Sequence, residues 1–230
     1  EFFDALPVAQ AIWRQSDYGS AGLWRKRLID LIDGRLDFID GPPLTVVELK
    51  NWNLNSQKYS AQNNLPDDGT IVEYCPLAST YIGKLSGHLI RYGGMFLIID
   101  YGHDGQSGDS VQAVSKHKPV DIFSQPGCAD LSHSVDFRAI RNAAKAAGAR
   151  LVGPVPQGEF LRSIGILERT EALAKQADIK TRRNLLAAVE RLVSNQHMGS
   201  TFKFALLIPP GNGSPPGFSH ISNKVESPLL

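Results

Sequence analysis

Apolar positions with two different spacings predict that helices and strands alternate along most of this chain. After Pro76, apolar residues stand at every fourth position, which predicts a helix that ends at Gly93: Leu77, Tyr81, Leu85 and Leu89. The run GMFLIIDYG (residues 94–102) follows at once, and its unbroken apolar character is typical of a strand covered on both faces. A helix that leads directly into a buried strand is the repeating unit of α/β folds.

The second half continues this alternation with a larger share of helix. Asp136 is placed to cap a helix over residues 136–148, and helical spacing returns in residues 159–176 and 181–195. Residues 149–155 and 202–210 predict two further strands. The tail 209–230 is rich in Pro, Gly and Ser, and we expect it to be flexible. The main domain is therefore predicted to cover residues 1–208.

The first third of the chain is less regular. Residues 5–15 predict either a strand or a short helix after Pro7. Asp33-Gly34 lies between two runs of alternating character, which is a strong signal for a two-residue hairpin turn. Residues 50–70 are polar and lack periodicity, so they predict a surface loop. We interpret about residues 12–70 as a hairpin insertion in the α/β domain.

Composition narrows the class of partner. Among 230 residues, 24 Lys and Arg balance 23 Asp and Glu, so no overall field favours nucleic acid or an anionic membrane surface. The longest apolar runs are strand-sized, which predicts no membrane span. Cys75 and Cys128 are isolated, which suits a reducing compartment, and the six histidines lack ligand spacing, so no metal site is predicted.

Candidate chemistry gathers at two places. Asp100, Tyr101 and His103 follow the buried strand on a glycine-rich turn, at the strand end where α/β sheets bind ligands. The alternative is that Asp100 only caps this turn. In EFFDALPV (residues 1–8), Glu1 and Asp4 would lie beside the Asp100 turn if the phenylalanines close a short strand. Two adjacent carboxylates repel unless a cation or a proton lies between them; the alternative is a fraying terminus.

Other candidate motifs lack the sequence context that their functions require. The glycines after residue 208 run into prolines instead of a helix, so they are no dinucleotide fingerprint, and no GxSxG nucleophile turn occurs. Ser132, His133 and Asp136 are residue types of a hydrolase triad, but they lie too close together on one segment to face one another. Loop and helix-cap roles are preferred for them.

An ordered set of segments resembles one protein family. The segments are EFFDALPV, GGMFLIIDYGHDG, the stretch from DSVQAV to HKPVD, PGCADLSHSVDF, GPVPQGEFLRSIGI and MGSTFKFALL, and they cover essentially residues 1–208. Together they resemble the MidA family of S-adenosylmethionine-dependent methyltransferases. The resemblance implies a class I methyltransferase (Rossmann-like) α/β sheet with an inserted hairpin and extra helices. It also implies S-adenosylmethionine as cofactor and a protein arginine side chain as substrate, since a mitochondrial member methylates arginine during assembly of respiratory complex I.

The resemblance places EFFDALPV inside a longer domain, at the end of a central strand. The glycine-rich strand–turn–helix that holds the cofactor in such folds is not among these 230 residues. We therefore expect the chain to be the C-terminal, substrate-facing part of a methyltransferase, with the N-terminal cofactor-binding portion missing and little activity alone.

Roles for individual residues follow from the resemblance together with the chemistry of a guanidinium. Carboxylates hold that cationic fork bidentately and bias charge away from the reacting nitrogen. The expected residues are Glu1, Asp4 and His103 as catalytic groups, Asp100, Tyr101, Gly102, Asp130 and Gln157 at the substrate, and Phe2, Phe3 and Pro7 at the cofactor. The compartment would be the bacterial cytoplasm or the mitochondrial matrix, and a dimer is left open. The alternatives are a non-catalytic assembly module that grips a partner protein and, least favoured, a hydrolase that uses the Asp100 turn.

Overall fold

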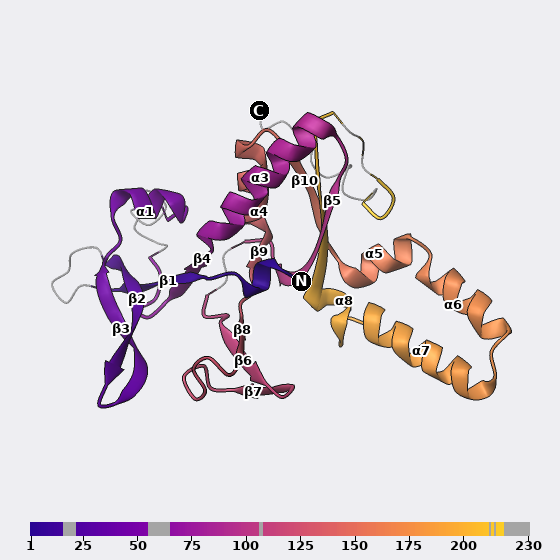
Figure 1. Cartoon of the computed structure of the whole chain (residues 1–230), viewed down its shortest axis with the longest axis horizontal. Coiled ribbons are helices and arrows are strands. Elements are labelled where there is room, and N and C mark those ends of the chain that lie inside the picture. The colour runs from indigo at the N-terminus through magenta and orange to yellow at the C-terminus, as the bar shows by residue number, and fades with distance from the viewer. Residues whose placement is uncertain (16–21, 55–64, 106–107, 212, 214, 219–230) are drawn as a thin grey trace. The chain divides into compact units, whose positions relative to one another are not determined.

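The computed structural model describes residues 1–15, 22–54, 65–105, 108–211, 213 and 215–218 (Figure 1). The chain divides into two compact units. The core unit comprises Glu1–Asp4, Ala78–Gly105 and the chain from Val135 onward, and the inserted unit comprises Ala5–Leu77 and Gln106–Ser134. The expected insertion of about residues 12–70 falls inside the inserted unit, which also takes in a second segment after the core strand.

The core unit alternates strands and helices, as the α/β prediction requires. Its elements are α3 (Pro76–Tyr92), β5 (Phe96–His103), β9 (Val135–Asp136), α4 (Phe137–Ala146), β10 (Arg150–Pro156), α5 (Gln157–Ser163), α6 (Ile166–Lys175), α7 (Ile179–Val193), α8 (Met198–Thr201) and β11 (Phe202–Ile208). The sheet order is β10-β11-β5-β9, with β11 antiparallel to both of its neighbours and β9 parallel to β5. The short 3-10 helix η1 (Phe3–Ala5) begins in this unit.

The helix predicted after Pro76 is confirmed, but its buried face differs from the expected one. Ala78, Ile82, Ser86 and Leu89 are buried, whereas Leu77 and Tyr81 are 41% and 38% exposed. Residues spaced by four drift around a helix of 3.6 residues per turn, so the apolar series alone does not fix which face is covered.

The strand predicted over residues 94–102 is also confirmed as β5, but it is not covered along its whole length. Phe96 and Leu97 are 37% and 43% exposed, whereas Ile98 and Asp100 are buried. β11 pairs with Phe96–Tyr101, and β9 pairs only with Gly102 and His103. Within the described residues, the start of β5 therefore pairs along one edge only. The exposure of Phe96 and Leu97 shows that the expectation of cover on both faces is wrong there.

The inserted unit contains two antiparallel sheets. The first has the order β3-β2-β1-β4 and is built from β1 (Ala9–Arg14), β2 (Leu23–Ile32), β3 (Arg35–Pro43) and β4 (Ile71–Tyr74). Asp33 and Gly34 join β2 to β3 with φ values of 48° and 78°, the left-handed pair that a type I′ turn requires, so the predicted hairpin is confirmed. The second sheet, with the order β7-β6-β8, comprises β6 (Gln112–Ser115), β7 (Lys118–Val120) and β8 (Asp130–Ser132).

An aromatic core holds the inserted unit together. Trp13, Trp24 and Trp52 are buried with Leu54 and other apolar residues, and the rings of Trp13 and Trp24 meet edge to face at 5.4 Å. Part of the predicted 50–70 loop is instead the end of α1 (Val46–Asn51), and residues 55–64 of that prediction lie outside the described residues.

Thr45 starts α1 with a capping box. Its hydroxyl accepts a 3.2 Å hydrogen bond from the backbone N–H of Glu48, and the Glu48 carboxylate accepts one of 2.9 Å from the backbone N–H of Thr45. The same carboxylate forms an ion pair of 2.6 Å with Lys26 of β2. The helix is thus tied to the sheet through one side chain.

The described end of the chain is packed rather than free. Phe218 is 2% exposed and lies in one cluster with Phe160 and Phe204, with a centroid distance of 5.2 Å to the Phe160 ring. Residues 219–230 of the expected flexible tail lie outside the described residues.

Candidate functional site

The carboxyl end of β5 organises the candidate site, which we call the Asp100 corner: Glu1–Asp4, Asp100–Asp104, Asp136 and Arg141. Asp100 is fully buried, and its Oδ2 atom accepts hydrogen bonds from the backbone N–H groups of Phe2, Phe3 and Asp4 at 3.1, 3.0 and 3.3 Å. Its Oδ1 atom accepts one from Tyr101 N–H at 3.0 Å. The carboxylate thus caps η1, a segment far away in sequence, and not only the turn that follows it, as the alternative interpretation had expected.

Burial raises the pKa of Asp100, and the nearby Asp4 carboxylate raises it further. The hydrogen bonds from the Phe2 and Asp4 backbone oppose this rise because they stabilise the charged form. Asp4 therefore lies close enough to Asp100 for the two charges to interact. This agrees with the expectation that residues 1–4 lie beside the Asp100 turn.

The first residues hold two acids at this corner. The backbone amine of Glu1 donates a 2.9 Å hydrogen bond to the carbonyl oxygen of Ile99, so the segment follows the edge of β5. Glu1 is exposed and Asp4 is partly exposed, so solvent or a ligand can reach both carboxylates. A cationic group is the natural ligand for such a pair. Their catalytic roles stay predictions.

Phe2 and Phe3 differ sharply in exposure. Phe3 is 2% exposed, whereas Phe2 is 47% exposed and meets Tyr81 of α3 edge to face at 5.2 Å. An exposed aromatic face can pack against a planar ligand, but the buried ring of Phe3 supports the segment from within. Of these two rings, only that of Phe2 is accessible, and the expected cofactor roles of both stay predictions.

Gly102 brings β9 against the end of β5. A Cβ atom at Gly102 would lie 2.2 Å from the carbonyl oxygen of Val135, so the parallel pairing of Gly102 with Val135 and of His103 with Asp136 requires glycine here. The expected substrate role of Gly102 stays a prediction, and the geometry explains the residue by strand contact alone.

Asp136 has the cap role that the sequence predicted. Its Oδ1 atom accepts hydrogen bonds from the backbone N–H groups of Arg138 and Ala139 at 2.9 and 3.2 Å, which starts α4. Burial raises the pKa of Asp136, and these hydrogen bonds and the neighbouring His103 oppose the rise. His103 thus lies within electrostatic range of the half-buried Asp136 carboxylate.

Arg141 fastens the turn after β5, a function that no sequence pattern predicted. Its guanidinium donates to both carboxylate oxygens of Asp104 at 2.7 and 3.0 Å and to the carbonyl oxygen of Gly153 at 2.9 Å. This bidentate pair connects β5, α4 and β10 at the same end of the sheet. Asp104 belongs to the DYGHDG motif, so the motif held a signal for it, whereas Arg141 lies within an ordinary helical pattern.

Tyr101 of the corner and the expected site residues outside it make contacts of other kinds. Tyr101 packs edge to face on Phe202 at 6.0 Å, and Gln157 is 5% exposed and donates to the carbonyl oxygen of Leu192 at 2.9 Å. Pro7 and Asp130 are exposed residues of the inserted unit, so they are described apart from the corner. The structure therefore brings together Glu1–Asp4 and Asp100–His103 of the expected set, and the roles of Tyr101, Gln157, Pro7 and Asp130 stay predictions.

No group of three or more His, Cys, Asp or Glu side chains in the described parts of the chain is placed to hold a metal ion. No helix within the described ranges is long and apolar enough to cross a bilayer. The Asp100 corner combines carboxylates, one imidazole, aromatic rings and the Arg141 guanidinium at the end of an α/β sheet.

The mixed sheet, the helices that alternate with it and the acidic corner at its strand ends define an α/β protein with a candidate site at the edge of the sheet. Comparison with known proteins identifies the family. Residues 1–155 match the family described as "Putative S-adenosyl-L-methionine-dependent methyltransferase", and the chain belongs to this family. The resemblance to MidA-type methyltransferases is thereby confirmed, together with S-adenosylmethionine as the family's cofactor.

Similar proteins agree with this family. "Protein arginine methyltransferase NDUFAF7, mitochondrial" from Xenopus tropicalis is 36% identical over 213 residues, which is 91% of this chain and 45% of the relative. The human protein of the same name is 33% identical, with 91% and 44% covered. The chain thus spans less than half the length of the curated relatives it matches.

Two solved structures share the fold. A COG1565 superfamily protein from Burkholderia thailandensis superposes with a TM-score of 0.75 at 25% identity, covering 95% of this chain and 56% of the other. A second structure from that organism, bound to S-adenosyl-homocysteine, has a TM-score of 0.74 at 24% identity, with 95% and 54% covered. These matches cover nearly the whole of this chain and give no support to the expectation of a missing N-terminal portion, which stays a prediction.

Proposed function

We propose that the protein containing this chain transfers a methyl group from S-adenosylmethionine to an arginine side chain of a protein substrate. The names of the curated relatives support the arginine specificity, and the Asp100 corner is the observation that carries it. A guanidinium stays charged at any working pH, so it requires carboxylates at the point where it is held. Glu1 and Asp4 offer two accessible carboxylates on a segment whose backbone Asp100 fixes.

The accessibility of each residue suggests its role in the proposed reaction. Glu1 and Asp4 bind the guanidinium and draw its charge toward the nitrogens that do not react. Asp100 is a positioning residue, because its oxygens are taken up by backbone N–H groups. His103 is the candidate acceptor for the proton that the nitrogen loses, supported by its electrostatic interaction with Asp136.

We propose that the corner contributes one described residue, Phe2, to holding the cofactor. When bound, S-adenosylmethionine supplies a methyl group on a sulfonium centre, which is open to in-line attack. The half-exposed ring of Phe2 would hold such a planar and cationic ligand, with buried Phe3 behind it. Because the 230 residues contain no glycine-rich cofactor turn, we propose that they transfer little methyl alone and that activity belongs to the full-length protein.

The partner and compartment extend this proposal. We propose a protein substrate, since an arginine side chain is the acceptor, and the mitochondrial matrix as the compartment if the source is a eukaryote, in line with the relatives' names. For a bacterial source the compartment would be the cytoplasm.

The test uses the full-length gene product, radiolabelled S-adenosylmethionine and a protein substrate in which single arginines are replaced by lysine. We expect label on arginine, with transfer lowered about 100-fold in Glu1→Gln and Asp4→Asn while S-adenosylmethionine binding measured by calorimetry persists. Glu168→Gln, an exposed acid on α6, is the matched control. Normal transfer by both variants would remove the carboxylate clamp, and binding of a partner protein without any transfer would favour a non-catalytic assembly module.

A further inference from the structure

The helices α6 and α7 form an antiparallel pair that extends away from the sheet of the core unit (Figure 1). Only Gln176–Asp178 separate the two helices, and Asp178 caps α7 by accepting a 2.7 Å hydrogen bond from Thr181 N–H. Helices of 10 and 15 residues gain most of their stability from packing of an apolar face. Yet Thr170 and Val193 are the only residues buried on them within the described part of the chain.

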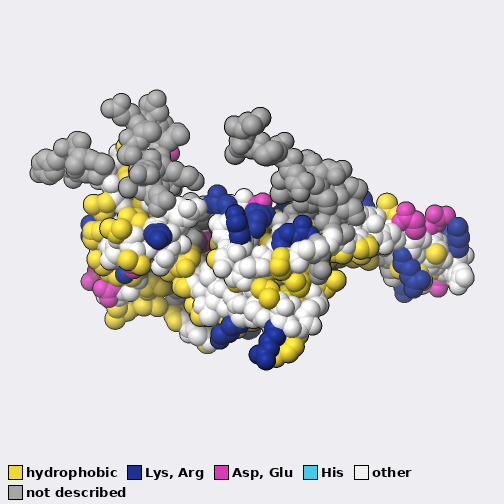
Figure 2. Space-filling model, turned by 90° about the horizontal axis from the view of Figure 1, so that it is seen from above, with side chains coloured by type: hydrophobic (Ala, Val, Ile, Leu, Met, Phe, Trp, Pro, Cys, Tyr) yellow, Lys and Arg dark blue, Asp and Glu magenta, His cyan; other side chains and the backbone are white. Residues whose placement is uncertain are grey.

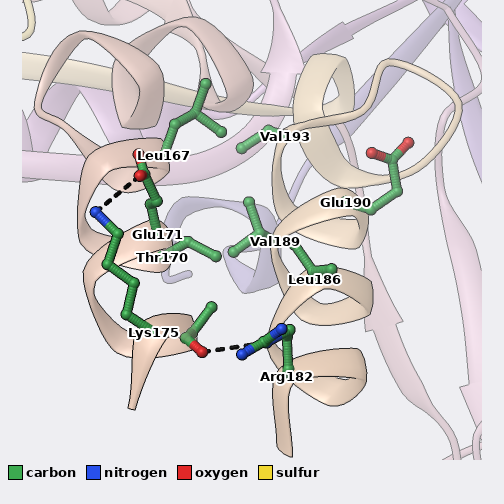
Figure 3. A pocket seen from close by; sticks show the side chains of 10 residues that line it. Leu167, Thr170, Glu171, Lys175, Arg182, Leu186, Val189, Glu190 and Val193 are labelled. Atoms are coloured by element: carbon green, nitrogen blue, oxygen red, sulfur yellow. Dashed lines mark hydrogen bonds and ion pairs between the residues drawn. The ribbon is translucent and has the colours of Figure 1, made fainter. Parts of the chain in front are cut away.

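An apolar groove of about 500 Å³ lies between these two helices (Figure 3). Its lining includes Leu167, Thr170 and Ala174 of α6 and Leu186, Val189 and Val193 of α7. Figure 3 shows Thr170 and Val189 directed toward one another across it. Leu167 and Leu186 remain 49% and 56% exposed, so the groove has apolar walls that the described residues do not cover.

The charged rim of the groove is balanced in sign. It carries the acids Glu171 and Glu190 and the bases Lys175 and Arg182. Figure 2 shows acidic and basic side chains side by side at the end of the molecule that α6 and α7 form. A rim with two charges of each sign does not favour a strongly acidic or basic partner, but it suits a surface that pairs with itself.

The positions of three residues on α7 give this self-pairing a register. Arg182, Leu186 and Glu190 are spaced by four residues and therefore follow one face of the helix, with about 12 Å between the first and the last. Leu186 stands midway. If a two-fold axis passes at Leu186, two antiparallel copies of α7 bring Arg182 opposite the partner's Glu190 at both ends and one Leu186 against the other.

The existing contacts leave these groups available. Lys175 is already paired with Glu171 at 2.9 Å, and Arg182 uses its Nε atom to donate to the carbonyl oxygen of Ala174 at 3.2 Å, which leaves its terminal nitrogens for another partner. Glu190 forms no ion pair with any other described residue.

We propose that the groove between α6 and α7 is the contact surface for a second copy of this chain, with the two helix pairs packing into a four-helix arrangement about an axis at Leu186. Each copy covers the other's exposed leucines, as facing helices do in bundles. This proposal does not depend on the methyltransferase activity.

The test is sedimentation equilibrium of the full-length protein and of the 230-residue chain over a micromolar range. We expect a dimer for both. Leu186→Glu, which sets two carboxylates against each other at the axis, should raise the dissociation constant of the dimer at least 100-fold. Arg182→Glu alone and Glu190→Arg alone should each raise this constant at least 10-fold, because each variant places like charges opposite one another at both ends of the helix pair. The double variant should return within about 3-fold of the original constant.

Arg183→Glu is the matched control, because it changes the neighbouring charge on α7 without touching the groove lining. Circular dichroism should show that all variants keep their helices. A protein that stays monomeric at 100 µM, or a dimer whose constant is the same in Leu186→Glu, would overturn the proposal. A monomeric full-length protein whose Leu186 amide is more protected from hydrogen exchange than in the 230-residue chain would show that another part of the protein covers the groove, which also overturns it.

Discussion

The Oδ2 atom of Asp100 accepts a 3.0 Å hydrogen bond from the backbone N–H of Phe3, a residue 97 positions earlier in the chain. The same oxygen serves the N–H groups on either side of Phe3. One buried carboxylate therefore fixes the path of the segment that carries Glu1 and Asp4. Because the contact is made to the backbone, it sets where the acids stand without using their side chains.

Replacing this carboxylate tests its anchoring role. Asp100→Asn replaces one accepting oxygen with an NH2 group, which is itself a donor and cannot accept the hydrogen bonds of the backbone N–H groups. We therefore expect the free energy of unfolding to fall by about 2 kcal/mol. Denaturant titration measures this loss, and hydrogen exchange should show the Phe3 and Asp4 amides losing protection. Asp67→Asn, at an exposed aspartate, should change stability little. A loss below about 0.5 kcal/mol for Asp100→Asn would contradict the anchor.

Two glycines with opposite surroundings make a paired prediction. Gly102→Ala places a Cβ atom 2.2 Å from a backbone oxygen of Val135, which forces β5 and β9 apart and should cost about 2 kcal/mol. Gly87→Ala lies in α3, where the added Cβ would meet no atom within 4 Å apart from the neighbouring helix backbone, and it should stabilise the protein by about 0.5 kcal/mol. Thermal unfolding of the two variants should shift in opposite directions. Equal shifts would mean that the close approach of β9 does not matter.

The capping box of α1 gives a pH-dependent prediction. Lys26 and the hydrogen bonds from Thr45 lower the pKa of Glu48 from 4.5 to about 2. A lowered carboxyl pKa stabilises the folded state above pH 4.5, and this stabilisation is lost as the pH falls from 4.5 toward 2. Glu48→Gln should therefore be less stable than the original protein at pH 7 and equally stable near pH 2.

Tryptophan fluorescence during urea titration measures the difference in stability between Glu48→Gln and the original protein, because all three tryptophans of the chain pack in the core of the inserted unit. Lys26→Gln should show the same convergence at low pH. A difference that stays constant from pH 7 to pH 2 would rule out the capping box as its source.

The aromatic contact at the end of the described chain is testable by truncating a side chain. Phe218→Ala empties a site that is 2% exposed beside Phe160, so we expect a loss of about 3 kcal/mol. Phe218→Leu should lose less, because it refills most of the volume. Proteolysis should then cut faster after residue 208 in Phe218→Ala. Unchanged stability in both variants would show that the tail contributes nothing to the core unit.

Local patterns in the sequence predicted the elements whose signals are short-range. The Asp33-Gly34 turn, the helix after Pro76, the β5 strand and the Asp136 cap each depend on residues within a few positions of one another, and each is present. Strands β6–β8 have only three or four residues each, which is too short for a periodic signal.

The misses concern contacts between distant segments. Which face of α3 is buried, and how much of β5 is covered, depends on neighbours that no local spacing specifies. At the candidate site, the sequence placed Asp100 at a strand end and Glu1 and Asp4 nearby, but it could not show that backbone groups occupy the Asp100 oxygens. Arg141 was missed because its partners, Asp104 and Gly153, come from two other elements.

The Asp100 anchor also bears on how such a site could diverge. Every residue type except proline carries the same main-chain donor, so positions 2 and 4 could exchange side chains while the loop kept its course, with the buried Phe3 left in place between them. Novel specificities would then arise by altering what the loop displays, whereas a change at position 100 would disturb the scaffold beneath all of them.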